Sequence, residues 1–226
     1  KSMTAMSIMR LLPKTAQIKS GEIYFKGENL LLYKEKQMRE LRGNRIALIP
    51  QDPMTSLNPL YTVGNQLVEA IRAHSHVSER QALRKAREVM DMVCIPDADR
   101  KLKFYPHEFS GGMKQRIIIA MALACQAELI IADEPTTALD VTIQKQIMDL
   151  LDDIKKEFGT TILLISHDLA LVSNYADNIS VMYSGHIVEK APAKDFFRKP
   201  LHPYSIALLD SLPTRNPALK LRTIEG

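Results

Sequence analysis

Hydrophobic residues follow three kinds of pattern along the chain, and these occur in successive blocks. Residues 18–50 alternate short apolar runs with turns, and within this block the segment RIALIP has the composition of a short buried strand. From about residue 62 to 108, apolar residues recur at three- and four-residue spacing among many charges, which predicts amphipathic helices. Beyond residue 110, helical segments separate short, nearly all-apolar runs: ELIIAD, TTILLIS and ISVMYSG.

Apolar strands that alternate with helices indicate a parallel sheet covered by helices on both faces. We therefore expect an α/β fold, with a doubly wound core that a helical segment interrupts. The sequence after Pro200 contains several prolines and is expected to form an appendage to that core.

Composition narrows the function classes without selecting one. Hydrophobic residues make up 46% of the 226 residues and charged residues 25%, as in ordinary globular proteins. No apolar run approaches the roughly 18 residues that a membrane span needs. The net charge of +4 comes from scattered residues, and no basic stripe points to nucleic acid. Cys94 and Cys125 predict buried thiols in a reducing compartment rather than a disulfide or a metal site.

Two adjacent carboxylates, Asp133 and Glu134, follow the apolar run LIIA. Ligands of parallel α/β sheets bind beyond the carboxyl ends of the strands, so one carboxylate there could hold Mg²⁺ and the other could polarise water. The alternative is a helix N-terminus, where the helix dipole favours acidic residues.

Three other short segments have possible chemical roles and ordinary alternatives. In FSGGMKQR, Ser110 is a candidate helix N-cap, while Gly111 and Gly112 would let backbone N–H groups approach an anion. His167 follows the strand-like run LLIS and could equally be structural. Gln51 follows the strand-like run ALIP and could be a polar loop residue.

The order of these segments resembles the motif series of the ATP-binding cassette (ABC) ATPases over essentially the whole chain. The resemblance implies a P-loop NTPase core with a mainly parallel sheet and an inserted helical subdomain. It also implies roles for six residues or motifs: Gln51 in the Q-loop, FSGGM as the signature, Asp133 as the Mg²⁺ residue of Walker B, Glu134 as the water-polarising base, Asp140 in the D-loop and His167 as the switch histidine. Gln51, Glu134 and His167 are therefore the expected catalytic residues, with Gln51 also near the metal.

On this resemblance, Lys1 and Ser2 correspond to the last two residues of the P-loop pattern G-x-x-x-x-G-K-[ST]. There the lysine reaches the β- and γ-phosphates and the hydroxyl binds Mg²⁺. We expect the chain to begin within its own Walker A, without the P-loop glycines and the preceding strands, and to end before a cysteine-bearing tail. The expected cofactors are ATP and Mg²⁺.

Four regions are expected on the same basis. They are a partial RecA-like core with the Q-loop over 1–61, a helical signature subdomain over 62–109, the rest of the core over 110–199, and a C-terminal extension over 200–226.

QDPMTSLNPLYTVGNQL, DEPTTALDVTIQKQI and HPYSIALLDSLP resemble the ATPases of dipeptide and oligopeptide importers, a group that includes nickel and glutathione importers. The signature carries Met113 where many ABC proteins have glutamine, a substitution familiar in this group.

The resemblance implies a head-to-tail dimer with a second ABC ATPase, identical or homologous. In that dimer Ser110, Gly111 and Gly112 contact the ATP of the partner. It also implies permease subunits, an indirect link to an extracytoplasmic solute-binding protein, and a peripheral location on the cytoplasmic face of the inner membrane. The alternatives are an ABC ATPase that acts on nucleic acid, which the scattered charge does not favour, or, for the chain as given without the P-loop glycines, an interaction module that does not bind ATP. The transported solute stays open.

Overall fold

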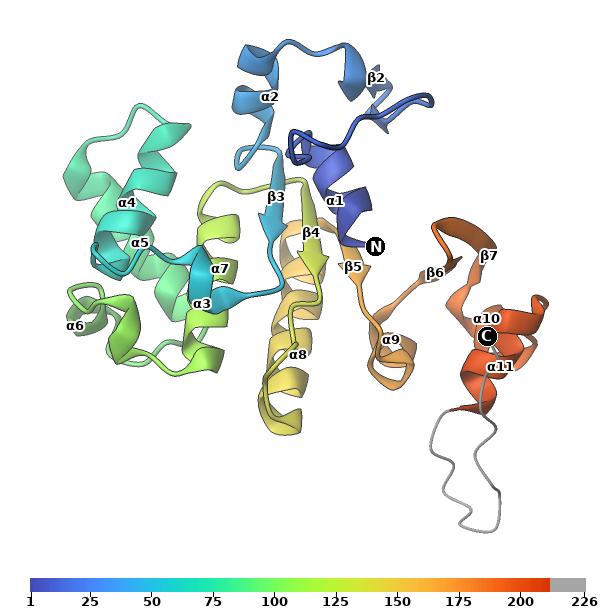
Figure 1. Cartoon of the computed structure of the whole chain (residues 1–226). Coiled ribbons are helices and arrows are strands. Elements are labelled where there is room, and N and C mark those ends of the chain that lie inside the picture. The colour runs from blue at the N-terminus through green and yellow to red at the C-terminus, as the bar shows by residue number, and fades with distance from the viewer. Residues whose placement is uncertain (212–226) are drawn as a thin grey trace. The chain divides into compact units, whose positions relative to one another are not determined.

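The computed structural model describes residues 1–211, which form two compact units. The first unit is Ser2–Ile165, and the second consists of Lys1 and the chain from Ser166 onward. Figure 1 shows the elements of both units. Residues 212–226, which make up most of the expected C-terminal extension, lie outside the described residues.

A three-stranded parallel sheet, in the order β3-β4-β5, forms the centre of the first unit. Its strands are β3 (Ile46–Ile49), β4 (Leu129–Asp133) and β5 (Thr161–Ile165). The register pairs Ile49 with Ala132 and Asp133 with Ile165. These strands are the apolar runs RIALIP, ELIIAD and TTILLIS, so the predicted parallel core is confirmed. Their carboxyl ends meet at one edge of the sheet.

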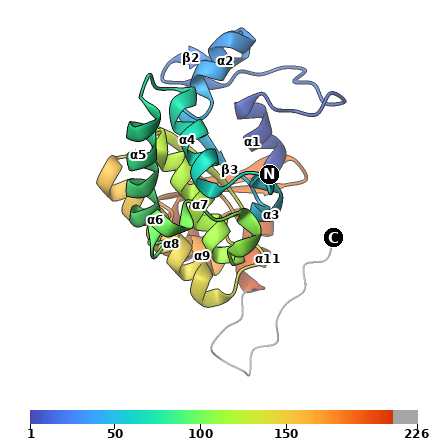
Figure 2. The same cartoon turned by 90° about the vertical axis from the view of Figure 1, so that its left-hand side faces the viewer.

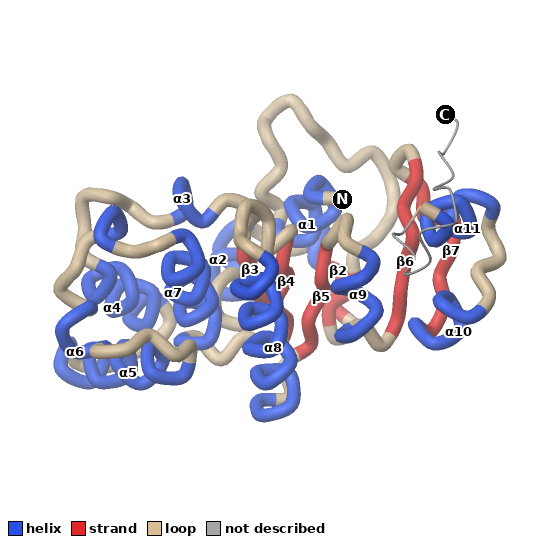
Figure 3. The backbone as a smooth tube through the Cα atoms, turned by 90° about the horizontal axis from the view of Figure 1, so that it is seen from below, coloured by secondary structure: helices blue, strands red, loops and turns tan. Residues whose placement is uncertain are grey.

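Helices cover both faces of this sheet. The helix α1 (Ser2–Met9) lies on one face, and α7 (Gly111–Ala124) and α8 (Val141–Phe158) lie on the other (Figure 3). Ala5 and Met9 of α1 are buried in one cluster with Ile46 and Ile131. Because side chains alternate along a strand, Asp133 points to the same face as Ile131, the face that α1 covers.

The other elements of the first unit flank this core. A short antiparallel hairpin joins β1 (Tyr24–Phe25) to β2 (Glu28–Asn29). The predicted helical block is present, and its helices α4 and α5 pack on α7 (Figure 2). The remaining helices are α2 (Glu35–Leu41), α3 (Pro53–Ser56), α4 (Val63–Ala73), α5 (Glu79–Met92) and α6 (Ala98–Lys101), with 3-10 turns at Leu30–Leu32 and Pro106–Glu108.

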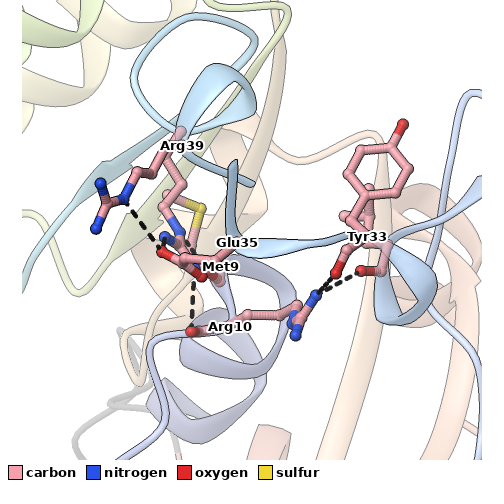
Figure 4. Close-up of polar contacts among 7 residues, drawn as sticks. Met9, Arg10, Tyr33, Glu35 and Arg39 are labelled. Carbon is pink, nitrogen blue, oxygen red and sulfur yellow. Dashed lines mark hydrogen bonds and ion pairs between the residues drawn. The ribbon is translucent and has the colours of Figure 1, made fainter. Parts of the chain in front are cut away.

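Arg42 anchors the C-terminal end of α1. Its Nε donates to the carbonyl oxygen of Met9 at 2.7 Å, and its Nη1 donates to Glu35 Oε1 at 2.6 Å. Figure 4 shows Met9 and Glu35 beside Arg10, which donates to the carbonyl oxygen of Tyr33. Since Arg42 lies just before β3, the C-terminal end of α1 is at the edge where the strands begin. The N-terminal end of α1 therefore points to the edge where they end.

The second unit contains one strand whose pairing differs from the prediction. The run ISVMYSG was expected in the parallel sheet, but β6 (Asn178–Tyr183) pairs antiparallel with β7 (His186–Pro192). The reason is the two-residue turn Ser184–Gly185, where both φ angles are positive, at 45° and 85°. Such a turn favours a tight hairpin, whereas parallel pairing needs a long crossover. The other elements are α9 (Leu169–Tyr175), α10 (Ala193–Arg198) and α11 (Pro203–Asp210).

The cysteines do not form a disulfide, but the expectation that both are buried is wrong for Cys94. Cys94 is exposed and Cys125 is partly buried. Cys94 follows the C-cap of α5 with a positive φ of 57°, so the chain turns away from the helix there and leaves the thiol at the surface.

Candidate functional site

The two adjacent carboxylates lie at the carboxyl end of the central strand. Asp133 is the last residue of β4 and is only 5% exposed. Glu134 extends the pairing by one step, since its N–H donates to the carbonyl oxygen of Ile165 at 2.9 Å. The helix N-terminus alternative is wrong for both residues, because the next helix starts at Val141 and its N-cap is Asp140.

Gln51 lies directly beside Glu134. Its Nε2 donates to Glu134 Oε2 at 2.9 Å, which joins the ends of two neighbouring strands. The Thr137 hydroxyl donates to the same oxygen at 3.0 Å. Glu134 itself has a positive φ of 48°, a conformation that costs about 1 kcal/mol for a residue with a Cβ. The carboxylate is therefore held in a defined position by two donors and by its own backbone.

Sequence reasoning missed two residues that shape this site. Thr137 is one, and Gln144 is the other, because its Nε2 donates to the carbonyl oxygens of Thr136 at 3.2 Å and Leu139 at 3.1 Å. Gln144 thereby fixes the loop between the carboxylates and α8. The sequence did contain a signal for Thr137, because this residue lies three positions after Glu134 in the same motif. Gln144 gave none, since a glutamine on an amphipathic helix is ordinary.

The residues present fit a magnesium ion. Asp133 Oδ1 is buried, and it has no hydrogen-bond partner within the described residues. Leaving a buried carboxylate oxygen unpaired is costly unless a cation binds it. Ser2 begins α1, whose N-terminal end points to the same edge of the sheet. Mg²⁺ binds through one or two carboxylates plus phosphates and water, so it needs no larger cluster. The part of the chain that the structure describes contains no group of three or more His, Cys, Asp or Glu residues suited to a metal.

Ser110, Gly111 and Gly112 form a second group at the start of α7. Ser110 is the predicted N-cap, and its hydroxyl accepts from the N–H of Met113 at 3.4 Å. Both glycines face the start of α8: a Cβ on Gly111 would lie 3.6 Å from Leu139, and one on Gly112 only 2.7 Å from Ile143.

Asp140 is next to this second group. Its Oδ1 accepts from the N–H of Ile143 at 3.0 Å, so Asp140 caps α8. The signature and D-loop residues are thus in contact through one shared residue, Ile143.

Lys1 and His167 belong to the second unit. Lys1 Nζ donates to the carbonyl oxygen of Ser166 at 2.7 Å, which places the lysine beside the residue that precedes His167. Asp168 caps α9 by accepting from the N–H of Leu171 at 3.0 Å. The predicted histidine therefore sits in a turn that a helix cap fixes on one side and Lys1 contacts on the other.

Two family models match the chain. One, described as ABC transporter, matches residues 1–137. The other, described as oligopeptide/dipeptide transporter, C-terminal region, matches residues 188–226. A probable peptide ABC transporter ATP-binding protein of Sinorhizobium fredii is 57% identical over 216 residues, covering 95% of this chain and 64% of that protein.

Other relatives give the same result. A putative peptide import ATP-binding protein of Brucella melitensis is 49% identical and covers 100% of this chain and 71% of that protein. The oligopeptide transport ATP-binding protein OppD of Escherichia coli is 48% identical, covering 94% of this chain. The chain spans 63% of the length of that relative.

Solved structures confirm the fold. A dimeric ATP-binding cassette in a post-hydrolysis state with ADP and Pi has a TM-score of 0.73 at 24% identity, covering 85% of this chain and 79% of that one. A cassette of a Clostridium perfringens cbiONQ ABC transporter complex has a TM-score of 0.73 at 26% identity, covering 91% and 76%.

Proposed function

The chain belongs to the ABC transporter family, and on that premise we propose that it is the ATP-hydrolysing, nucleotide-binding subunit of an importer of dipeptides or oligopeptides. The observation that carries the ATPase part is the hydrogen bond from Gln51 to Glu134, beside the buried carboxylate of Asp133. The match of residues 188–226 to the oligopeptide/dipeptide C-terminal region supports the solute class.

The proposed site residues divide the work of hydrolysis among them. Asp133 and Ser2 would hold Mg²⁺, which would supply charge neutralisation at the phosphates when bound. Glu134 accepts a hydrogen bond from the attacking water and orients it, while Gln51 and Thr137 keep the carboxylate in place. Lys1 binds the phosphates as a point charge, and His167 donates a hydrogen bond toward the γ-phosphate.

A second copy of such a subunit, or a homologous ATPase, completes each nucleotide site. Ser110, Gly111 and Gly112 stand at the N-terminal end of α7, where backbone N–H groups and the helix dipole favour an anion. That group binds the γ-phosphate of ATP held by the partner, and Asp140 lies at the same interface. Hydrolysis then requires the two subunits to close on each other.

The working partners are permease subunits, with a solute-binding protein linked through them, and the subunit acts at the cytoplasmic face of the membrane. No helix in residues 1–211 is both long and apolar enough to cross a bilayer. Docking to permeases would account for the proposed membrane association.

ATP hydrolysis by the full-length protein tests the first part of this proposal. Replacing Glu134→Gln should leave nucleotide binding intact and lower kcat by about 100-fold or more, because the water loses its orienting base. Glu157→Gln, an exposed glutamate at the end of α8, is the matched control. Undiminished turnover in Glu134→Gln would refute the assignment.

Magnesium binding has a separate readout. Replacing Asp133→Asn removes a buried, unpaired charge, so the metal-free protein should be as stable as the parent or more stable. The Mg²⁺-dependent increase in nucleotide affinity should disappear in the same variant. If that increase in nucleotide affinity persisted, residues other than Asp133 would have to bind the metal.

The solute class is tested in cells that lack the gene. Restoring it should restore uptake of a labelled dipeptide, and the Glu134→Gln version should not. Restored uptake of nickel without any peptide uptake would replace the peptide part of the proposal and leave the ATPase part in place.

A further inference from the structure

A cavity of about 550 Å³ lies at the amino-end edge of the sheet, opposite the carboxylates. Its floor is the start of β4 and β5, and its walls come from α5 and from the C-terminal ends of α7 and α8. Asp133 is the last of the five residues of β4, four steps from its first, so about 13 Å of strand separates the cavity from the candidate nucleotide site. The two sites are distinct.

The carboxylate of Glu128 on the cavity wall is already neutralised. Arg45 Nε donates to its Oε1 at 2.6 Å, and Lys26 forms an ion pair with its Oε2. Arg45 in turn lies over the ring of Phe25, 5.0 Å from its centroid. Two cations therefore face one anion on this side of the cavity.

Lys85 brings a further positive charge from α5. It is half-buried and lines the cavity, and it has no ion pair or hydrogen bond with any of residues 1–211. Burial raises the pKa of the nearby Cys125 thiol, and the charge of Lys85 opposes that rise, which places the ammonium close to the end of α7. A half-buried ammonium without a counterion favours an anionic partner.

The cavity walls also favour a positively charged group of a ligand, a short distance from Lys85. Glu88 lies three residues after Lys85, on the same side of α5, and its ion pair with Arg84 is long, at 3.9 Å, and exposed. The C-terminal ends of α7 and α8 both border the cavity, and each carries a partial negative charge of about half a unit.

Between these charges the cavity is apolar. Val89 and Leu123 are buried, while Met92 and Phe158 remain 48% and 45% exposed although both are large and apolar. Covering two such side chains would be favourable. The volume lies within the range of ordinary small-molecule sites, about 300–1,000 Å³.

We propose that this cavity binds a short zwitterionic peptide with apolar side chains. The peptide carboxylate pairs with Lys85, its ammonium group faces Glu88 and the helix C-termini, and its side chains cover Met92 and Phe158. A zwitterion fits this pattern better than phosphate or a nucleotide, because Glu88 and two helix C-termini lie beside the one unpaired lysine of the cavity and favour a ligand that also carries a positive group. The inference rests on the cavity alone and goes beyond the proposed ATPase.

Calorimetric titration of the full-length protein with Leu-Leu tests the proposal. Saturable binding is expected, with affinity falling about 10-fold or more for Leu-Leu amide, which lacks the carboxylate. N-acetyl-Leu-Leu, which lacks the ammonium, and Gly-Gly, which lacks the apolar side chains, should also bind more weakly. Equal affinity for all four compounds, no binding of Leu-Leu, or binding of inorganic phosphate in place of Leu-Leu would overturn it.

Variants locate the site. Lys85→Met should weaken Leu-Leu binding about 10-fold or more while thermal unfolding stays unchanged, and Lys103→Met, an exposed lysine outside the cavity, should have no effect. Phe158→Ala should weaken Leu-Leu more than it weakens Gly-Gly. Undiminished binding in Lys85→Met refutes the site. ATP hydrolysis measured on the same samples keeps the two proposals apart, since either can fail while the other holds.

Discussion

The side-chain amide of Gln51 donates a 2.9 Å hydrogen bond to the carboxylate of Glu134, although 83 residues separate them in the chain. The contact exists because β3 and β4 are parallel neighbours, so the residues that follow them emerge at the same edge. It links the loop leading to α3 and α4 with the carboxylate proposed to orient water. A change in the position of that loop can therefore directly alter the position of the Glu134 carboxylate.

Replacing Gln51→Ala should lower kcat for ATP hydrolysis about 10- to 100-fold with little change in KM, because a charge-assisted hydrogen bond that positions Glu134 is lost. Gln51 is exposed, so the free energy of unfolding should change by less than about 0.5 kcal/mol. Steady-state kinetics and urea unfolding measure the two effects. Gln17→Ala, an exposed glutamine elsewhere, is the control. An unchanged kcat would show that the contact does not serve catalysis.

The two signature glycines should respond differently to alanine. Gly112→Ala places a Cβ 2.7 Å from Ile143 Cγ2, so it should destabilise the protein by about 1–3 kcal/mol. Gly111→Ala meets Leu139 at an ordinary 3.6 Å and should fold as well as the parent. Urea unfolding compares the two variants. Adding Ile143→Ala to Gly112→Ala should recover part of the loss, and a Gly112→Ala protein of parental stability contradicts the packing described here.

Two substitutions of Asp140 can separate its role as the N-cap of α8 from the role of its negative charge. Asp140→Ala removes the oxygen that accepts from Ile143 N–H and should cost about 1 kcal/mol of stability, whereas Asp140→Asn keeps an accepting oxygen and should cost much less. Asp168→Ala removes the N-cap of α9 in the same way and should cost a similar amount of stability, so it is the matched control. If Asp140→Asn lowers ATP-dependent dimerisation without lowering stability, the charge acts at the subunit interface. Equal stability of the alanine and asparagine variants would rule out the capping role.

Most of the core and several contacts of the site were predictable because they depend on local sequence. The apolar runs before Gln51 and Glu134 identify their strands, and parallel strands necessarily bring their carboxyl ends together. Ser110 was predictable as a cap because the residue type and the following helical run occur side by side.

The failures have a common physical origin in geometry that residue type alone does not specify. The pairing of β6 was set by two positive φ angles at Ser184 and Gly185, and a serine there gives no strong signal. The exposure of Cys94 likewise followed from a left-handed residue at a helix end. Gln144 holds the loop after Glu134 through backbone carbonyls, which no side-chain pattern reveals.

Glu35 pairs with Arg42, the residue that donates to the carbonyl of Met9 at the C-terminal end of α1, and this pair should make stability depend on pH. The hydrogen bond from Arg42 holds the pKa of Glu35 below its ordinary value of 4.5, although some desolvation opposes the effect. A carboxyl whose pKa is lower in the folded state stabilises the fold above its unfolded pKa. That contribution disappears as the pH falls from 4.5 through the lower, folded value.

Replacing Glu35→Gln should therefore lower the free energy of unfolding at neutral pH, and the difference from the parent should shrink to nothing as the pH falls from 4.5 through the lower pKa of the folded state. Since the Glu35 side chain is 57% exposed, high salt should also reduce the difference. Unfolding measured against pH for both proteins gives the result, with Glu22→Gln, an exposed glutamate, as control. Parallel pH profiles for the parent and Glu35→Gln would mean that Arg42 holds the end of α1 through the carbonyls of Met9 and Arg10 without help from Glu35.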